Sequence, residues 1–267
     1  MKPVHITSRD NSLLSHARAV RDGKVTDSIF VEGLRLCEEA LSSRLRIEAL
    51  IYSTELAQKD RAAKVIRELA SVADKSVTVS EKLLESISYT KTPQGIVVIA
   101  ERPAVKDEEF RARQGSGSLL VMLHRINNPV NVGAIVRTAE AAGATGVITT
   151  AGTADPFSPK AIRGAMGATF RLPIWTGARY AEAIDWCQAN GTQTICADVD
   201  ATGNYTEVDW SRSTALVMGS ESSGLSPEEI ALTDEAVKIP MQGSTESLNV
   251  AVAAGILLYE ARRHRAS

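Results

Sequence analysis

Two short apolar runs near the C-terminal end of the chain are each followed by a loop of small and polar residues. Residues 215–218 lead into Gly219, Ser220 and Glu221, and residues 237–239 lead into a second polar loop. Each run has the form of a buried strand that feeds a loop. Because open α/β sheets form ligand sites at the carboxyl ends of their strands, we expect these two loops to hold a ligand, largely through main-chain groups.

An arginine stands in an otherwise apolar stretch that is expected to be helical. Arg137 follows Asn131 by six residues and needs an anionic partner unless it faces solvent. We expect its guanidinium to engage a phosphate or a ribose. A structural ion pair between Arg137 and Glu221 or a neighbouring group is the alternative. Asn131, expected in the loop before this helix, either orients ribose hydroxyls or caps the backbone.

Two more polar side chains stand at the start of the last helix, expected over residues 247–264. Ser247 and Asn249 lie where free backbone N–H groups favour anionic or polar ligand atoms. The alternative for Ser247 is a plain helix N-cap, and the alternative for Asn249 is backbone capping.

Three motifs in the second half of the chain carry a family resemblance. They span residues 128–139, residues 216–226, and residues 239–241 together with residues 247–253. On these motifs the chain resembles the SpoU-type RNA 2′-O-ribose methyltransferases of the knotted SPOUT superfamily. The resemblance implies S-adenosylmethionine as the cofactor, a deep trefoil knot in the C-terminal half, and a homodimer whose interface lies by the cofactor site.

The resemblance also implies roles for individual residues. Backbone groups at Gly219, Ile239 and Leu248, with Met241 beside them, would hold the adenosyl part of the cofactor. The implied catalytic set is Asn131, Arg137, Glu221, Ser247 and Asn249. The arginine is the residue proposed in the family to activate the 2′-hydroxyl. Because arginine is a poor base, we expect it to polarise the hydroxyl and anchor a phosphate.

Two positions depart from the common family pattern. His124 stands where many relatives have Asp, and Ala165 stands where the family commonly has Ser. Neither belongs to the core of the three motifs, so these departures bear on the RNA target rather than on the reaction.

The first 105 residues alternate short strands with helices and therefore predict a small α/β domain. Strands are expected at residues 28–31, 47–52, 77–79 and 95–100, and helices at residues 11–22, 33–41 and 60–72 and after an N-cap at Ser80. This half resembles the family's N-terminal RNA-binding domain at Ser8, Asn11, residues 31–33 and residues 92–95. For residues 93–95 the alternative is simply a turn before a strand.

Residues 106–118 are expected to be a linker, flexible by composition, and residues 119–267 a second α/β domain. Its βαβα order predicts a largely parallel sheet with helices on both faces. The expected strands are residues 119–123, 146–150, 172–174 and 192–197 and the two apolar runs. The expected helices are residues 133–142, 159–166, 180–190 and the last helix, and residues 208–210 are expected to be a surface connection.

Composition sets broad limits on function. The 267 residues carry 30 Lys and Arg against 32 Asp and Glu, so the net charge of −2 does not by itself indicate a nucleic-acid binder. The three cysteines have no metal-ligand spacing, and we expect no metal. The chain contains no signal peptide and no long apolar span, which predicts a soluble cytoplasmic protein without membrane partners.

The leading hypothesis is an S-adenosylmethionine-dependent RNA 2′-O-methyltransferase that acts on large-subunit ribosomal RNA. A transfer RNA substrate is one alternative. A non-catalytic RNA-binding or ribosome-assembly protein on the same fold is another, and the intact catalytic set argues against it. The first strand of the second domain is not followed by Gly-x-Gly-x-x-Gly, which argues against a dinucleotide-binding enzyme.

Overall fold

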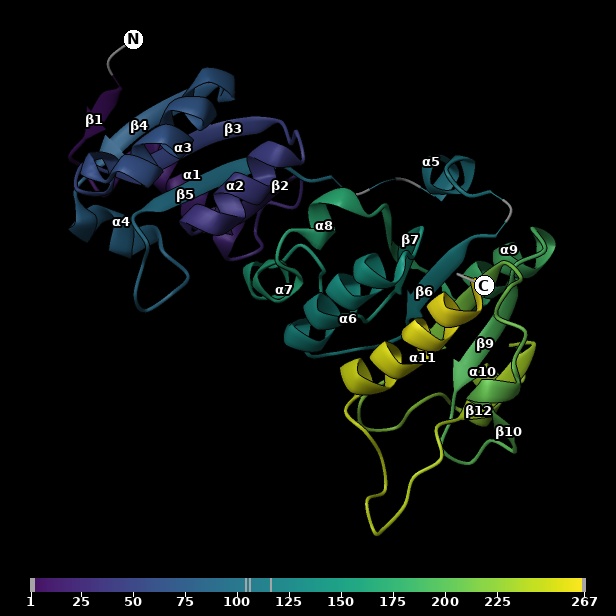
Figure 1. The fold of residues 1–267 in the computed structure, drawn as a ribbon. Helices are drawn as coiled ribbons and strands as arrows, with labels where there is room; N and C mark the ends of the chain where they lie inside the picture. The colour runs from purple at the N-terminus through teal and green to yellow at the C-terminus, as the bar shows by residue number, and fades with distance from the viewer. Residues whose placement is uncertain (1–2, 104, 106, 116, 266–267) are drawn as a thin grey trace. The chain divides into compact units, whose positions relative to one another are not determined.

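The computed structural model describes residues 3–103, 105, 107–115 and 117–265. The chain divides into two compact units (Figure 1). Unit 1 comprises Met1–Pro103 and Phe157–Arg171, and unit 2 comprises Ala104–Pro156 and Leu172–Ser267. The C-terminal half of the chain therefore contributes one segment to unit 1.

Unit 1 is built on a five-stranded sheet. Its strands are β1 (Val4–Ile6), β2 (Ser28–Glu32), β3 (Ile47–Ser53), β4 (Lys75–Val79) and β5 (Ile96–Glu101). They lie in the order β1-β4-β3-β5-β2, and β5 runs antiparallel to both of its neighbours while the other pairs are parallel. The short edge strand β1 was not predicted.

The helices of unit 1 begin where their sequence signals place them. They are α1 (Ser12–Arg21), α2 (Leu34–Ser42), α3 (Asp60–Val72), α4 (Glu81–Ile87), α7 (Pro159–Ala165) and α8 (Ala168–Arg171), with a 3₁₀ turn at Leu56–Gln58. The Asn11 side chain caps α1 by accepting a hydrogen bond from the backbone N–H of Leu13 at 2.9 Å. Ser80 caps α4 in the same way, as predicted.

The segment that carries α7 and α8 is part of the packing of unit 1, where α7 contacts β2. Arg171 Nη1 lies 2.6 Å from Glu39 Oε2, and the Arg102 guanidinium lies 4.5 Å from the centre of the Phe157 ring. A Cβ on Gly167 would come within 2.8 Å of the Glu39 side chain, so this close approach requires glycine. The Ala165 departure therefore lies in unit 1, at the end of α7.

Unit 2 is built on a seven-stranded sheet in which every pair of strands is parallel. Its strands are β6 (Leu119–Leu123), β7 (Gly146–Thr150), β8 (Ile174–Ala178), β9 (Gln193–Ala197), β10 (Gly203–Asn204), β11 (Thr214–Met218) and β12 (Glu235–Lys238), in the order β10-β12-β9-β11-β6-β7-β8. The predicted parallel sheet is confirmed, although the two-residue β10 was not predicted.

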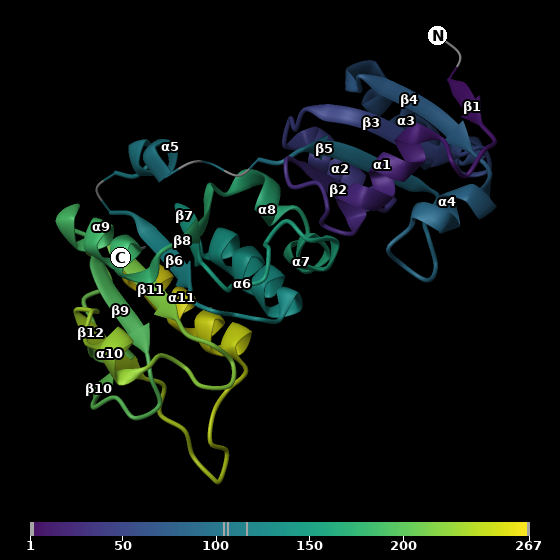
Figure 2. The ribbon, with the colours of Figure 1, turned by 180° about the vertical axis from the view of Figure 1, so that it is seen from behind.

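Helices cover this sheet, as the front and back views show (Figures 1 and 2). They are α5 (Asp107–Ala112), α6 (Pro129–Ala142), α9 (Tyr180–Ala189), α10 (Pro227–Ile230) and α11 (Val250–Arg265), with a 3₁₀ turn at Tyr205–Glu207. The last helix, α11, packs beside α6. None of the helices in the described ranges is long and apolar enough to cross a membrane.

Two of these helices begin at residues other than those predicted. α6 begins at Pro129, four residues before the predicted start, because proline suits the first helical position and Asn128 caps it. α11 begins at Val250, three residues after the predicted start, because the Asn249 side chain accepts a hydrogen bond from the helix backbone at 2.9 Å. The alternative in which Ser247 is the N-cap is therefore excluded.

Two segments that were expected on the surface or in a flexible linker contribute to the core. Trp210 is fully buried, and its indole N–H donates to the Tyr205 carbonyl at 2.9 Å, so the predicted surface connection is wrong. Phe110 of α5 is also fully buried, with its ring 6.0 Å from that of Trp175 and 5.9 Å from that of Trp186. Large aromatic side chains of this kind stabilise a core by the area that they bury.

Candidate active site

Two adjoining cavities open at the carboxyl ends of the unit 2 strands. The larger cavity, of about 780 Å³, lies among the loops after β9, β11 and β12 and the start of α11. The smaller cavity, of about 570 Å³, lies between the first turn of α6 and the start of α11. Both are lined by Glu221, Ser222, Ser247, Leu248 and Val250, so the two cavities share one wall.

Eight of the nine predicted site residues line these cavities. The larger cavity is lined by all four predicted cofactor residues, Gly219, Ile239, Met241 and Leu248. The smaller cavity is lined by Asn131, Glu221, Ser247 and Asn249. Arg137 is the exception, because it is not among the residues that line either cavity.

The loop after β11 turns back on itself so closely that its first residue must be glycine. The backbone N–H of Gly224 donates to the Ser220 carbonyl at 3.0 Å, which closes the loop. A Cβ on Gly219 would lie 2.6 Å from the carbonyl carbon of Gly224, closer than real Cβ atoms approach backbone. The main chain of this loop is thereby brought to the wall of the larger cavity.

The Glu221 carboxylate joins this loop to the start of α6. It accepts hydrogen bonds from the backbone N–H of Asn127 at 3.0 Å, the backbone N–H of Asn128 at 3.1 Å, and Asn131 Nδ2 at 3.0 Å. Partial burial raises the pKa of Glu221, but these donors outweigh it and hold the pKa below its ordinary value. The group is therefore an anion at neutral pH, and three donors of this chain engage its two oxygens.

Two asparagines extend this network across the smaller cavity. Asn249 Nδ2 donates to Asn131 Oδ1 at 3.4 Å, and Asn131 in turn donates to Glu221. Asn131 is the third residue of α6, so its expected place in the preceding loop is wrong. The capping role considered for Asn249 is confirmed, since it holds the first turn of α11. Ser247 lies in the loop before that helix and lines both cavities.

Arg137 lies nearly two turns further along α6, and its side chain is exposed. Within the described ranges, no hydrogen bond or ion pair joins it to Glu221, so the structural ion pair considered from the sequence does not form. At helical spacing Arg137 shares a face of α6 with Val130, Ala134 and Ala141. This cation is therefore presented to solvent rather than to the cavities of its own chain.

His124 is the centre of a buried polar cluster at the end of β6. Its Nδ1 lies 2.8 Å from Thr150 Oγ1 and its Nε2 lies 3.0 Å from Glu229 Oε1, while Arg125 Nη2 lies 2.6 Å from both Glu229 oxygens. The Tyr180 ring lies against the imidazole, with the ring centres 4.4 Å apart and the planes tilted by 51°. Burial lowers the pKa of His124 although the Glu229 carboxylate opposes this. The departure at His124 is thus accommodated by the Glu229 carboxylate, which His124 shares with Arg125.

Sequence reasoning missed some of the residues that line the cavities. Asp198, Val199 and Asp200 follow β9 and line the larger cavity, and Asn127 and Asn128 line the smaller one. Asp198, Val199 and Asp200 could have been identified by their position directly after a parallel strand. The same signal identified the loops after β11 and β12.

In unit 1, residues that matched the family's RNA-binding domain hold loops in place. The buried Glu32 carboxylate accepts hydrogen bonds from the backbone N–H groups of Tyr89 at 2.8 Å and Thr90 at 3.1 Å and from the Thr90 hydroxyl at 2.6 Å. Gln94 Oε1 accepts a hydrogen bond from the Leu34 backbone at 3.1 Å. The loop before β5 is therefore tied to the start of α2, which supports a structural role for Gln94.

Comparison with known families accounts for most of the chain. The SpoU rRNA Methylase family model matches residues 118–259, and the MRM3-like substrate binding domain model matches residues 16–98. The 23S rRNA (guanosine(2553)-2′-O)-methyltransferase RlmP of Bacillus subtilis is 30% identical over 237 residues, which are 89% of each chain. The 23S rRNA (uridine(2479)-2′-O)-methyltransferase of Streptomyces viridochromogenes is 32% identical over 89% of this chain and 83% of its own.

A solved structure agrees with this assignment. The AdoMet bound rRNA methyltransferase from Sinorhizobium meliloti is 33% identical, has a TM-score of 0.86, and matches over 97% of both chains. The family model for the catalytic half covers more than half of the 267 residues, and the two cavities lie within the region that it matches. The chain therefore belongs to the SpoU rRNA Methylase family.

Proposed function

We propose that this chain transfers a methyl group from S-adenosylmethionine to a ribose 2′-hydroxyl of large-subunit ribosomal RNA. One observation carries the proposal: Glu221, Ser247 and Leu248 line both cavities, so a cofactor site and a polar substrate site share a wall. The two 23S rRNA 2′-O-methyltransferases, which align over 89% of this chain, support ribosomal RNA as the substrate class.

The larger cavity fits S-adenosylmethionine. Its wall brings main-chain groups close to the ligand space, because Gly219 has no Cβ, and Ile239, Met241 and Leu248 supply apolar surface for an adenine ring. Asp198 and Asp200 lie on the same wall and supply carboxylates for hydroxyl and amino groups. When bound there, the cofactor supplies a methyl group activated by the sulfonium charge.

The smaller cavity would hold the target ribose. The Glu221 oxygens are occupied by three donors, so this carboxylate positions Asn131 rather than taking a proton itself. Asn131 and Asn249 remain able to donate to ribose oxygens, and Ser247 lies on the wall between the ribose and the cofactor. Orientation of the hydroxyl against the methyl donor is the main contribution that these residues make to the rate.

Arg137 is proposed to polarise the 2′-hydroxyl and to anchor the adjacent phosphate. Because it lines neither cavity of its own chain, we assign it to the cavity of a second copy. The surface beside it supports a homodimer: Val130 of α6 is 42% exposed, and Val252 and Tyr259 of α11 are 53% and 51% exposed. Apolar side chains exposed together on two neighbouring helices are typical of a two-fold interface.

The dimer has its own test. Val252→Glu with Tyr259→Glu should give a monomer in light scattering. Mixing Arg137→Ala protein with Glu221→Ala protein should raise activity above that of either variant alone through hybrid dimers. A dimeric double variant would exclude this interface, and a mixture no more active than its parts would exclude the assignment of Arg137 to a second copy.

The methyl-transfer assay tests the function itself. Labelled S-adenosylmethionine is incubated with bulk RNA that lacks the modification, and the labelled fraction is digested to locate an alkali-resistant ribose. Arg137→Ala should lower the rate by at least about a hundredfold, as expected for loss of a group that acts on the reacting hydroxyl. Arg179→Ala, which removes another exposed arginine of unit 2, is the matched control.

The outcomes separate the alternatives. Label in transfer RNA would retain the reaction and overturn the proposed substrate. Cofactor binding without label in any RNA would favour a non-catalytic ribosome-assembly protein.

The proposed function also assigns a role to each part of the chain and a reducing environment to the protein. We assign residues 1–105 to RNA binding, residues 106–118 to a linker that packs Phe110 into the core of unit 2, and residues 119–267 to catalysis, with a trefoil knot near the cofactor loops. The β9-β11-β6 strand order and the packing of α11 on α6 support a threaded chain end, which an experimental trace of residues 219–249 would test. Three buried free cysteines fit a reducing cytoplasm.

A further inference from the structure

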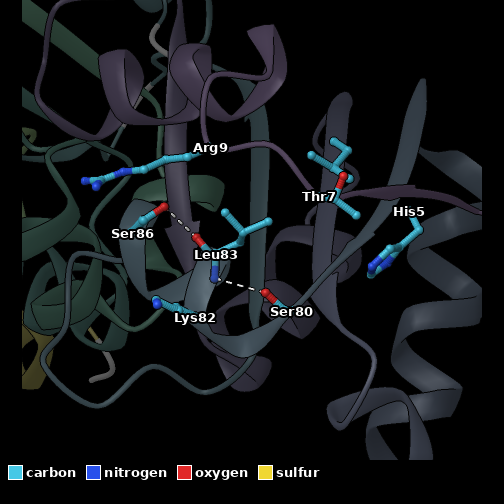
Figure 3. A pocket seen from close by; sticks show the side chains of 8 residues that line it. His5, Thr7, Arg9, Ser80, Lys82, Leu83 and Ser86 are labelled. Carbon is cyan, nitrogen blue, oxygen red and sulfur yellow. Dashed lines mark hydrogen bonds between the residues drawn. The ribbon is translucent and has the colours of Figure 1, made fainter.

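A third cavity, of about 390 Å³, lies in unit 1, far along the sequence from the methyl-transfer motifs. One wall is the end of β1 and the residues that follow it, and the other is α4 with its N-cap (Figure 3). The polar residues that line it are three basic side chains, His5, Arg9 and Lys82, and three hydroxyls, Thr7, Ser80 and Ser86. Neither a carboxylate nor a phenyl or indole ring is among its lining residues.

Some basic residues of unit 1 are neutralised by nearby carboxylates. Arg61 pairs with Glu38, Arg171 pairs with Glu39, and Arg46 lies near two carboxylates. Within the described part of the chain, by contrast, neither the Arg9 guanidinium nor the Lys82 ammonium has a hydrogen bond or an ion pair. Figure 3 shows both side chains extending the same way on either side of Ser86. Unneutralised cations that face one cavity favour an anion.

Helix α1 fixes both walls of the cavity. Arg18 Nη2 donates to the Arg9 carbonyl at 2.9 Å, which holds the loop after β1. Arg21 Nη1 lies one turn further along and donates to the carbonyls of Ser86 at 3.5 Å and Ser88 at 3.2 Å, which holds the end of α4. The loop and the helix are therefore set before any ligand arrives, which lowers the entropic cost of binding.

The hydroxyl groups of Ser80 and Ser86 determine which hydrogen bonds this cavity can make to a ligand. Ser86 Oγ already donates to the Leu83 carbonyl at 2.7 Å, and Ser80 Oγ accepts from the Leu83 backbone, which leaves the Ser80 O–H free to donate. Together with Arg9 and Lys82 this makes a set of donors with few competing acceptors. A phosphate, which accepts several hydrogen bonds and carries negative charge, matches that set.

We propose that this cavity binds a backbone phosphate of the RNA substrate, at a distance along the chain from the cavity that holds the target ribose. The inference rests on the proposed function, because it takes RNA as the ligand. The lining residues offer charge and donors but no phenyl or indole surface for stacking, so the contact holds the RNA without reading its sequence. A free nucleotide carries the same phosphate chemistry and is the other source to be distinguished.

The test compares two double variants of the full chain in RNA binding. Arg9→Gln with Lys82→Gln removes both cations of the cavity, and Lys64→Gln with Arg67→Gln removes two exposed cations of α3 as a matched control. Affinity for a large-subunit ribosomal RNA fragment is measured by fluorescence anisotropy across a salt series. The cavity variant should bind about tenfold more weakly, and its slope of log K against log salt should be shallower by about 0.7 to 1.

A charge-preserving variant shows whether the positive charge of the cavity is what binds the RNA. Arg9→Lys with Lys82→Arg should restore affinity, and S-adenosylmethionine affinity and the unfolding midpoint should be unchanged in all variants. Equal RNA affinity and salt slope in the cavity and control variants would overturn the proposal. Phosphorus NMR titration with adenosine monophosphate or inorganic phosphate that shows sub-millimolar binding at this cavity, without an effect of the variants on RNA, would reassign it to a free nucleotide.

Failure of the proposed function is distinguishable from failure of this inference. If the wild-type chain methylates ribosomal RNA and the cavity variant binds it normally, the inference alone fails. If the wild-type chain methylates no RNA but binds it through Arg9 and Lys82, the phosphate site stands and the enzymatic proposal fails.

Discussion

The Glu221 carboxylate connects segments that are about ninety residues apart in the sequence, since it holds two backbone N–H groups before α6 and the Asn131 side chain. Its pKa is held below the ordinary value of 4.5. A carboxylate whose pKa is lowered by folding stabilises the folded state fully at pH values above its unfolded pKa. It loses this stabilising free energy as pH falls through its folded pKa. The connection between the β11 loop and α6 is therefore complete at neutral pH and is lost as pH falls through a folded pKa that lies below 4.5.

Glu221→Gln should lower methyl transfer by about fivefold at neutral pH. An amide retains one acceptor oxygen but turns N–H groups toward the donors, and because the site is exposed we expect a loss of about 1 kcal/mol rather than the larger cost of a buried charge. Steady-state kinetics on ribosomal RNA measures the change, with Glu235→Gln on β12 as the control. Equal rates for the two variants would show that this network does not position the substrate.

The loop between β11 and α10 requires glycine at position 219, whereas helix α11 contains a glycine, Gly255, that its packing does not require. A Cβ at Gly219 would collide with the Gly224 backbone, whereas a Cβ at Gly255 would meet only the Thr138 methyl carbon at 3.7 Å, an ordinary contact. The same substitution should therefore have opposite effects at the two positions.

Gly219→Ala should cost about 1–3 kcal/mol of unfolding free energy and weaken S-adenosylmethionine binding at least tenfold, because the loop must open to admit the methyl group. Gly255→Ala should add about 0.5–1 kcal/mol, since alanine loses less backbone entropy in a helix. Chemical denaturation and calorimetric titration of both variants provide the comparison. Tight cofactor binding by Gly219→Ala would contradict the close approach of the loop.

Across the whole molecule, the proposed ligand sites are divided between the two units. Both cavities proposed for methyl transfer lie in unit 2, and the cationic cavity lies in unit 1. S-adenosylmethionine at about a hundred times its dissociation constant should stabilise the native state by about 2.7 kcal/mol.

This stabilisation should be local. Hydrogen exchange should slow in the loops after β9, β11 and β12 and leave the strands of unit 1 unchanged, because the ligand contacts only unit 2. Mass spectrometry of peptides from both units measures the effect, with S-adenosylmethionine omitted as the control. Equal protection in both units would contradict a cofactor site confined to unit 2.

Local patterns were sufficient to predict most elements of both units. β6, β7 and α3 begin and end where apolar runs and helical periodicity placed them. The predicted start of α6 at Gly133 followed the apolar residues of the helix. Asn128 followed by Pro129 is itself a helix-start signal, and the helix begins there. The short edge strands β1 and β10 carry too few residues for a periodic signal.

By itself, the sequence determined the family and the parallel sheet. It also placed eight of the nine predicted site residues on segments that line the two cavities, because motifs at the carboxyl ends of parallel strands meet wherever the sheet forms. Only the tertiary structure decided that Arg137 faces solvent, that Trp210 is buried, and that Phe157–Arg171 packs within unit 1. Each of these depends on contacts between residues that are distant in sequence, and local spacing carries no information about such contacts.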